Sequence, residues 1–133
     1  MKRLDGKVCI ITGSNSGVGA ATAELFAAEG AKVVITARRV DKLEEVANKI
    51  KANGGEVLAV RCDVSNEEDV KNMVKATVDT FGTVDVLVNN AGILEEGLKP
   101  IDKCTLEDIE KVYSINAKGT MLCSREATKV MKE

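Results

Sequence analysis

A tyrosine, an asparagine and a lysine lie close together in the segment VYSINAKG, residues 112–119. Tyr113 is the only tyrosine of the chain, and a tyrosine beside a lysine on one helix can form a proton-transfer pair. Helical neighbours face each other at a separation of three or four residues. Lys118 follows Tyr113 by five residues and therefore lies about 140° around the helix. The spacing argues against such a pair, and because Tyr113 continues the apolar positions Ile109 and Val112, we predict that it lies in the core.

The composition is typical of a soluble globular protein. Hydrophobic residues make up 44% of the 133 residues and charged residues 30%, which is the balance of a folded domain. We expect residues 1–133 to form one domain with its own core. The net charge of −2 gives no reason to expect nucleic acid or an anionic membrane as a partner, and no apolar run approaches the roughly 20 residues of a membrane span. We predict a cytoplasmic location.

Metal and histidine chemistry are not expected. The chain has no histidine, and its four cysteines are far apart, without a C-x-x-C pair: Cys9, Cys62, Cys104 and Cys123. Buried reduced thiols are therefore a better interpretation than a zinc site. The commonest general base at neutral pH is also missing, so proton chemistry would need Tyr, Lys, Cys or a carboxylate.

Short β-branched runs alternate with amphipathic helical segments. Strands are predicted over residues 7–12, 32–37, 56–62 and 84–90, and their nearly continuous apolar character is typical of buried parallel strands. Three helical stripes lie between and after them: Leu43, Val46, Ala47 and Ile50; Val70, Met73, Val74, Val78 and Phe81; Leu106, Ile109, Val112, Tyr113 and Asn116. The alternation predicts an α/β fold with a parallel sheet of about four strands and helices on both faces.

Helix boundaries are marked from both sides. Capping-box spacing occurs at three predicted helix starts: Asp41 with Glu44, Ser65 with Glu68, and Thr105 with Asp108. Glycines stand where C-terminal caps belong: Gly30, Gly54 with Gly55, and Gly82.

A glycine-rich segment, TGSNSGVG at residues 12–19, joins the first predicted strand to an alanine-rich helix. A strand, a turn and a helix in this order can bind a diphosphate: Gly13 allows the tight turn, Gly17 lets backbone N–H groups approach the phosphates, and Gly19 lets the helix pack closely on the strand. The spacing is not that of a Walker loop, which disfavours a nucleoside triphosphate. Three glycines alone could instead be simple turn chemistry, although their position after strand one favours the binding role.

Four motifs together resemble the short-chain dehydrogenase/reductase family. They are TGSNSGVG, CDVS at 62–65, NNAG at 89–92 and SINAKG at 114–119, and they occur in the family's order and spacing. The resemblance extends from about residue 4 to the last residue. It implies a Rossmann-like fold with strand order 3-2-1-4, truncated before a fifth strand, and hydride transfer between a nicotinamide dinucleotide and an alcohol or ketone.

The resemblance also assigns a role to individual residues of the cofactor site. The diphosphate loop would comprise Gly13, Ser14, Ser16, Gly17, Val18 and Gly19. Asp63 would accept a hydrogen bond from the adenine amino group, with the backbone of Val64 beside it. The alternative is that Asp63 is only a carboxylate at a strand end or helix entry.

The NNAG motif supplies the residues expected at the ribose. Asn90, Ala91 and Gly92 would line the ribose where the fourth strand ends, whereas Asn89 is expected to tie neighbouring strands together. The motif could also be an ordinary polar strand exit.

The end of the second predicted strand bears on the choice of cofactor. An acidic residue there would bind the ribose 2′-hydroxyl, and a basic one would suit a 2′-phosphate. The chain has Arg38 and Arg39 there and no acid before Asp41, so NADP(H) is favoured over NAD(H). Two points stand against this: Ser16 occupies a loop position where many NADP-preferring relatives carry a basic residue, and surface arginines are commonly just solvated.

The family resemblance implies a four-residue proton relay of asparagine, serine, tyrosine and lysine. Asn116 matches the catalytic asparagine, but we expect the chain to end, still in helical rhythm at Glu133, before the other three. We therefore predict a dinucleotide-binding half of an oxidoreductase that is inactive alone. A non-catalytic dinucleotide-binding module and a self-associating fragment without ligand are the alternatives.

Strand order 3-2-1-4 would leave strand four at an apolar edge of the sheet. Because unpaired edges promote association, we expect a homodimer or larger assembly through that edge.

Overall fold

Four parallel strands form one sheet in the order β3-β2-β1-β4. The strands are β1 (Val8–Thr12), β2 (Lys32–Ala37), β3 (Glu56–Arg61) and β4 (Val86–Val88). This computed structural model describes residues 2–93 and 99–133. In the register of the sheet, Ile10 of β1 lies beside Val34 of β2 on one side and Leu87 of β4 on the other. The predicted parallel sheet and strand order are confirmed.

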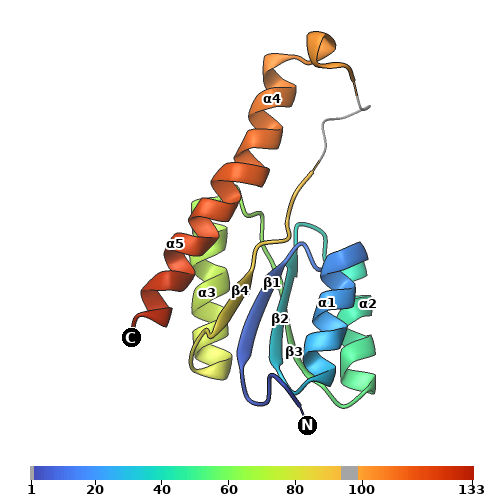
Figure 1. The fold of residues 1–133 in the computed structure, drawn as a ribbon, viewed down its shortest axis with the longest axis vertical. Coiled ribbons are helices and arrows are strands. Elements are labelled where there is room, and N and C mark those ends of the chain that lie inside the picture. Colours follow the sequence, from blue (N-terminus) through green and yellow to red (C-terminus); the bar gives the residue numbers. More distant parts are fainter. Residues whose placement is uncertain (1, 94–98) are drawn as a thin grey trace.

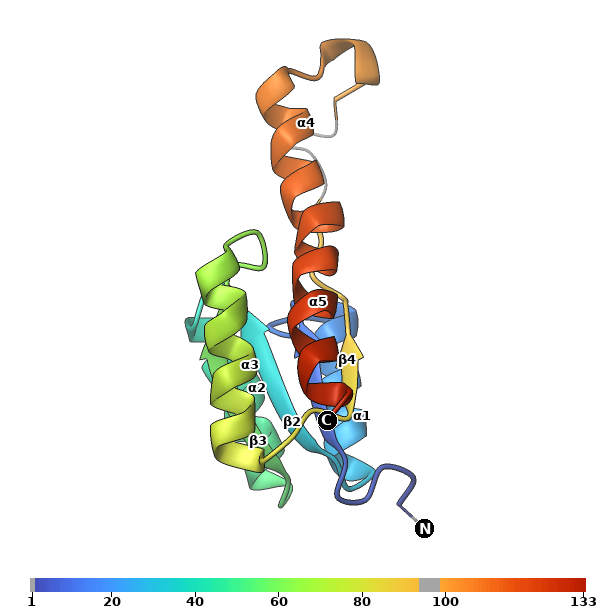
Figure 2. The ribbon, with the colours of Figure 1, turned by 90° about the vertical axis from the view of Figure 1, so that its left-hand side faces the viewer.

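Helices cover both faces of the sheet. Helices α1 (Gly17–Ala28) and α2 (Asp41–Ala52) lie on one face, and α3 (Glu67–Phe81) and α5 (Thr120–Met131) lie on the other (Figures 1 and 2). Alternate strand residues enter the two cores, as the two-residue period of a strand requires. Ile11 packs with α1 and α2, whereas Ile10 packs with α3 and α5. Both isoleucines are fully buried.

A long helical arm follows β4 in the chain. The short helix η1 (Ile101–Lys103) precedes α4 (Leu106–Tyr113), which continues through a π-helical segment η2 (Ser114–Gly119) into α5. Figure 1 shows α4 extending beyond the sheet, whereas α5 lies beside α3. No residue of α4 is buried, and Tyr113 is 65% exposed. The prediction that Tyr113 lies in the core is therefore wrong, because this part of the helix extends beyond the four described strands.

The three predicted N-terminal caps have different outcomes. The capping box of α4 is confirmed: Thr105 Oγ1 accepts a hydrogen bond from the N–H of Asp108, whose carboxylate accepts one from the N–H of Thr105. The cap predicted at Ser65 is wrong by one residue. Asn66 caps α3 instead, since the Ser65 hydroxyl donates to Asp63.

The predicted cap of α2 is also wrong, whereas the glycine caps are confirmed. Asp41 is the first residue of α2, and Val40 precedes it without a capping side chain. Positive φ angles of 91°, 84° and 90° end α1, α2 and α3 at Gly30, Gly54 and Gly82. Within residues 2–93 and 99–133, no helix has the length and apolar character needed to cross a bilayer.

Candidate functional site

The glycine-rich loop connects β1 to α1 at the carboxyl edge of the sheet. Gly13 has a φ of +62°, and a Cβ there would lie 2.8 Å from the Cα of Ala91. A Cβ on Gly19 would lie 2.6 Å from Asn90 Nδ2, so α1 approaches the loop as closely as glycine allows. Gly17 has open space around it, where a Cβ would meet no atom within 4 Å. The first N–H groups of α1, which have no partner inside the helix, can therefore face an anionic ligand.

Two buried hydroxyl groups hold the loop to its neighbours. Ser14 Oγ donates to the carbonyl of Ile11 at 2.7 Å and accepts from the N–H of Thr36 at 2.9 Å. Thr12 Oγ1 accepts from the N–H groups of Asn90 and Ala91, each at 3.0 Å. The buried side chain of Ser14 thus fixes the conformation of the loop through hydrogen bonds to β1 and β2. Its neighbours Ser16, which makes no capping hydrogen bond, and Val18, which is 75% exposed, lie at the open side.

The side-chain amides of the two asparagines after β4 bind different parts of the chain. Asn89 Nδ2 donates to Ser124 Oγ on α5 at 3.1 Å, so it connects β4 to a helix, and the prediction that it ties neighbouring strands is wrong. Asn90 Nδ2 donates to the carbonyl of Gly13 at 3.0 Å. The side chain of Asn90 therefore ties the exit of β4 to the end of β1, next to the place where the ribose is predicted to bind.

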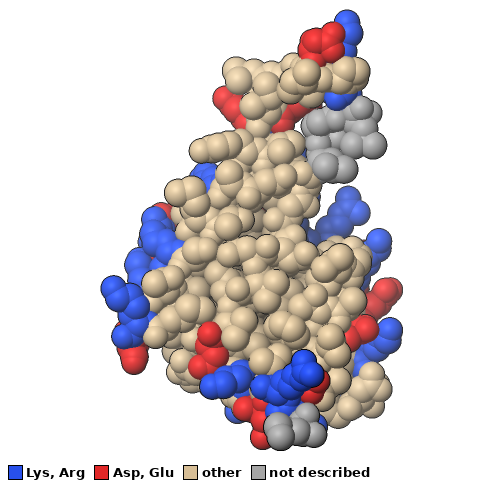
Figure 3. Space-filling model, in the orientation of Figure 1, with Lys and Arg blue, Asp and Glu red and all other residues tan. Residues whose placement is uncertain are grey.

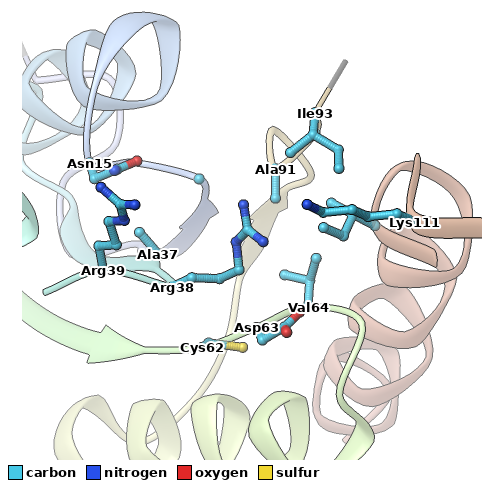
Figure 4. Close-up of a pocket in the computed structure, with 13 residues that line it drawn as sticks. Asn15, Ala37, Arg38, Arg39, Cys62, Asp63, Val64, Ala91, Ile93 and Lys111 are labelled. Atoms are coloured by element: carbon cyan, nitrogen blue, oxygen red, sulfur yellow. The ribbon is translucent and has the colours of Figure 1, made fainter. Parts of the chain in front are cut away.

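A pocket of about 560 Å³ opens beside this loop. Its walls come from the segments that follow all four strands and from the arm after β4 (Figure 4). The predicted site residues that line it are Gly13, Arg38, Asp63, Val64, Ala91 and Gly92. The predicted residues Ser14, Ser16, Gly17, Val18, Gly19, Asn90 and Asn116 are not among the lining residues. Residues far apart in the sequence thus meet at the carboxyl edge, where ligands of doubly wound sheets bind.

Charges in the pocket are mostly positive. Arg38, Arg39 and Lys111 line it together with one carboxylate, Asp63. Partial burial raises the pKa of Asp63, but hydrogen bonds from the hydroxyl and N–H of Ser65, with nearby Arg38 and Arg61, outweigh it and hold the pKa below its usual value. Asp63 is therefore ionised at neutral pH and can only accept hydrogen bonds.

Several lining residues were not predicted as site residues, although some of them stand within the motifs. They are Asn15, Ala37, Arg39, Cys62, Ile93, Lys111 and Ile115. Arg39 follows the same strand end as Arg38, and the sequence pattern had indicated both arginines there. Burial raises the pKa of the Cys62 thiol to about 11, so Cys62 contributes a neutral, weakly polar wall. Nothing in the sequence of α4 marked Lys111, because a lysine on an amphipathic helix is ordinarily a solvated residue.

The side chain of Asn116 fixes the arm to the segment after β4. Its Oδ1 accepts from the N–H of Ile93 at 2.8 Å, and its Nδ2 donates to the carbonyl of the same residue at 2.7 Å. Asn116 lies within the π-helical segment, a kind of distortion that is frequent at functional sites. Three residues later, Gly119 is packed so closely that a Cβ would lie 3.1 Å from the Cβ of Val64. These contacts place the arm against the wall that carries Asp63.

Three of the four cysteines are buried. Cys9, Cys62 and Cys123 are buried and Cys104 is partly exposed, and all four are free thiols. Buried reduced thiols are thus confirmed for three of the four. Among residues 2–93 and 99–133, no group of three or more His, Cys, Asp or Glu side chains is arranged to hold a metal ion.

Comparison with known proteins identifies the family. The short chain dehydrogenase family model matches residues 7–133, so the chain belongs to the short-chain dehydrogenase/reductase family, as the motifs predicted. It is 46% identical over 132 residues to tropinone reductase-like 1 of Erythroxylum coca, covering 98% of this chain and 47% of that protein. It is 40% identical over 132 residues to a 3-oxoacyl-[acyl-carrier-protein] reductase of Synechocystis, covering 98% of this chain and 53% of the relative.

Solved structures share the same fold. A Serratia marcescens short-chain dehydrogenase/reductase F98L/F202L mutant superposes with a TM-score of 0.90 at 35% identity, over 96% of this chain and 52% of that one. The citronellol catabolism dehydrogenase AtuB of Pseudomonas aeruginosa gives a TM-score of 0.89 at 38% identity, with the same coverage. The chain thus spans about half the length of the relatives it matches. The family implies a nicotinamide dinucleotide cofactor, and the crowded glycines and the cationic pocket fit one.

Proposed function

We propose that this chain is the dinucleotide-binding half of an NADP(H)-dependent oxidoreductase that interconverts an alcohol and a ketone. The observation that carries the proposal is the pocket at the carboxyl edge, where the glycine loop, a cationic strand end and an ionised Asp63 meet. When bound, the dinucleotide would supply or accept the hydride. The residues of the chain would hold its diphosphate at Gly13–Gly19, its ribose near Ala91 and Gly92, and its adenine at Asp63 and Val64.

The preference for NADP(H) is supported by the end of β2. The strand ends at Ala37, and Arg38 and Arg39 follow it into the pocket wall. A 2′-phosphate requires such cations, whereas a free 2′-hydroxyl requires an acceptor. The first acid beyond them, Asp41, begins α2 and is exposed.

We further propose that residues 1–133 bind the cofactor but do not transfer hydride by themselves. The only tyrosine, Tyr113, is 65% exposed, and residue 117, four positions later, is an alanine rather than a lysine. No hydrogen bond joins Tyr113 to Lys118 in the described part of the chain. Asn116 matches the family's asparagine, and its amide is already bound to Ile93. A non-catalytic binding module is the alternative that shares these observations.

One set of titrations tests the proposal. NADPH and NADH are titrated calorimetrically into the wild-type chain and an Arg38→Ala variant, and turnover is measured with a panel of carbonyl compounds. We expect tighter binding of NADPH, a loss of that preference in Arg38→Ala, and no turnover. An Arg3→Ala variant, changed at an exposed arginine outside the pocket lining, should behave as wild type. Equal binding of both cofactors would contradict the NADP(H) preference, and turnover would contradict inactivity.

We also propose that the chain self-associates through β4, because this strand forms an edge of the sheet. Strand β4 lies at one edge of the order β3-β2-β1-β4, and its three residues are only half-buried. Figure 3 shows few charged side chains over the central part of this face, where Figure 1 places β4. Because charged side chains are a common protection of strand edges, we expect a homodimer or larger assembly. A single monomeric species in sedimentation at about 50 µM would contradict it, because association depends on concentration.

A further inference from the structure

Lys111 approaches the pocket from the arm, on the wall opposite Arg38. It lies on α4, one helical turn before the buried Ile115, and both residues line the pocket. Residues four apart share a helix face, so the stem of Lys111 follows the same wall. In Figure 4 the Lys111 side chain points from α4 into the pocket, toward Arg38, and Asp63 and Val64 lie between the two walls.

Within the described residues, Lys111 has no ion-pair partner, whereas a lysine of α3 and one of α5 are paired. Lys75 binds Asp79 at 2.6 Å, and Lys129 binds Glu126 at 2.9 Å. The N–H of Val64 likewise makes no hydrogen bond within the described part of the chain. One end of the pocket therefore presents two donors without partners, an ammonium and an N–H group, beside the carboxylate of Asp63. These groups match a ligand that carries one donor flanked by acceptors.

We propose that Lys111 is a further recognition residue for the adenine base, donating a hydrogen bond to its ring nitrogen N7. The inference rests on the proposed function and adds to it a residue that no family motif supplies. Adenine carries an amino donor with a ring-nitrogen acceptor on each side, whereas guanine carries a carbonyl acceptor in place of the amino group. Asp63 and the N–H of Val64 are consecutive along the chain and suit the adjacent amino group and N1. Lys111 lies on a different element, α4, and is the group that we assign as donor to N7.

The two cations on opposite walls therefore have separate tasks. Arg38 and Arg39 follow β2 on the wall expected to face the 2′-phosphate; in Figure 4 Arg39 lies beside Asn15, and the Arg38 side chain extends from this wall into the pocket. Lys111 lies on the wall beside Ile93 and Ala91. Since NADPH and NADH share the adenine and differ only in the 2′-phosphate, a loss at Lys111 must weaken both cofactors equally. A loss at Arg38 must weaken NADPH alone.

The test compares affinities for NADPH and NADH by calorimetry in the wild-type chain, Lys111→Met, Lys111→Arg and Lys118→Met. Lys118→Met is the matched control, because Lys118 is an exposed lysine of the same arm that does not line the pocket. We expect Lys111→Met to weaken both cofactors about fivefold, the worth of one ordinary hydrogen bond, with their ratio unchanged. Lys111→Arg should retain most of the affinity, and Lys118→Met all of it. Thermal unfolding curves should be unchanged in all three variants.

Two outcomes overturn the inference while the proposed function stands: unchanged affinities in Lys111→Met, or a loss confined to NADPH, which would place Lys111 at the 2′-phosphate. Failure of the wild-type chain to bind either cofactor would instead overturn the proposed function and this inference with it. Competition by ADP and 7-deaza-ADP gives a second measurement. The wild-type chain should bind ADP more tightly, and Lys111→Met should bind both alike; a preference retained in Lys111→Met would exclude the N7 contact.

Discussion

The glycine loop and the arm, which stand on two sides of the pocket and are called here the loop wall and the arm wall, are built in different ways. The glycine loop is surrounded by buried contacts, with Ser14 bonded to β1 and β2 and Gly19 pressed against Asn90. The part of the arm that lines the pocket, α4 with η2, is held there by the two hydrogen bonds of Asn116 and the packing of Gly119 on Val64, and α4 buries none of its residues. The loop wall is therefore part of the core, whereas the arm wall is an attachment. Changes at the closely packed positions of the loop should destabilise the fold more than changes on α4, which should mainly alter binding.

The largest expected effect compares two isoleucines in the two regions. Ile10 is fully buried between β2 and β4, and Ile109 on α4 is 51% exposed. We expect Ile10→Ala to lower the free energy of unfolding by about 3 kcal/mol, because it removes buried methyl groups and leaves a cavity. Ile109→Ala should change it by less than about 0.5 kcal/mol. Urea unfolding measures both, and similar losses would show that the apolar face of α4 is covered in solution.

The second comparison lies within the loop. An alanine at Gly19 would place its Cβ 2.6 Å from Asn90 Nδ2 and against the Gly13 carbonyl, whereas at Gly17 it meets open space at a φ of +57°. We expect Gly19→Ala to destabilise by about 2 kcal/mol through overpacking and to abolish NADPH binding. Gly17→Ala should cost about 1 kcal/mol from backbone conformation alone. Thermal unfolding and a parallel NADPH-binding assay measure both variants. A Gly19→Ala variant with wild-type stability and affinity would contradict the close packing at Gly19.

A smaller effect is expected where the arm is attached. Asn116→Ala removes the two hydrogen bonds to Ile93, at 2.8 and 2.7 Å. Because their net worth at an exposed site is modest, we expect a loss of about 1 kcal/mol in urea unfolding, together with weaker NADPH binding as the arm wall loosens. Asn89→Ala, which removes one exposed bond to Ser124, should leave binding unchanged. Equal binding losses in the two variants would indicate that Asn116 has no special role in placing the arm.

The smallest effect concerns the start of α4 at low pH. Hydrogen bonds from Lys99 and from the N–H of Thr105 lower the pKa of Asp108 from 3.8 to about 2. A carboxyl group with a lowered pKa in the folded state stabilises above its unfolded pKa and loses that contribution as the pH falls. Melting temperatures should therefore carry a small Asp108-dependent decrease between pH 3.8 and about 2. In Asp108→Asn this part of the pH dependence should vanish; an unchanged profile would contradict the assignment.

Sequence patterns predicted the sheet half of the molecule well because its periodicities have one interpretation. Continuous β-branched runs fixed the strands, and the spacing of Gly13, Gly17 and Gly19 located the loop. Burial of Leu43 and Ile50 also followed the predicted stripe of α2. In these elements the local pattern and the tertiary contacts agree, which is the usual property of a folded core.

The arm was harder to predict because its apolar pattern does not report what lies beneath it. Leu106, Ile109 and Tyr113 form a helical stripe, yet all three are exposed, since α4 extends beyond the sheet. The π-helical segment contacts Ile93 through Asn116 and Val64 through Gly119, and both partners are distant in sequence. A cap can also shift by one residue, as at Asn66, when Ser65 finds a closer partner in Asp63.

The central claim is that both walls form one dinucleotide site, and residue-resolved NMR tests it most directly. NADPH is titrated into the isotopically labelled 133-residue chain, and the backbone N–H signals are followed. We predict saturable shifts on the loop wall at Gly17, on the strand ends at Val64 and Gly92, and on the arm at Lys111, all with one dissociation constant. The absence of saturable shifts, or shifts confined to one wall, would contradict the account.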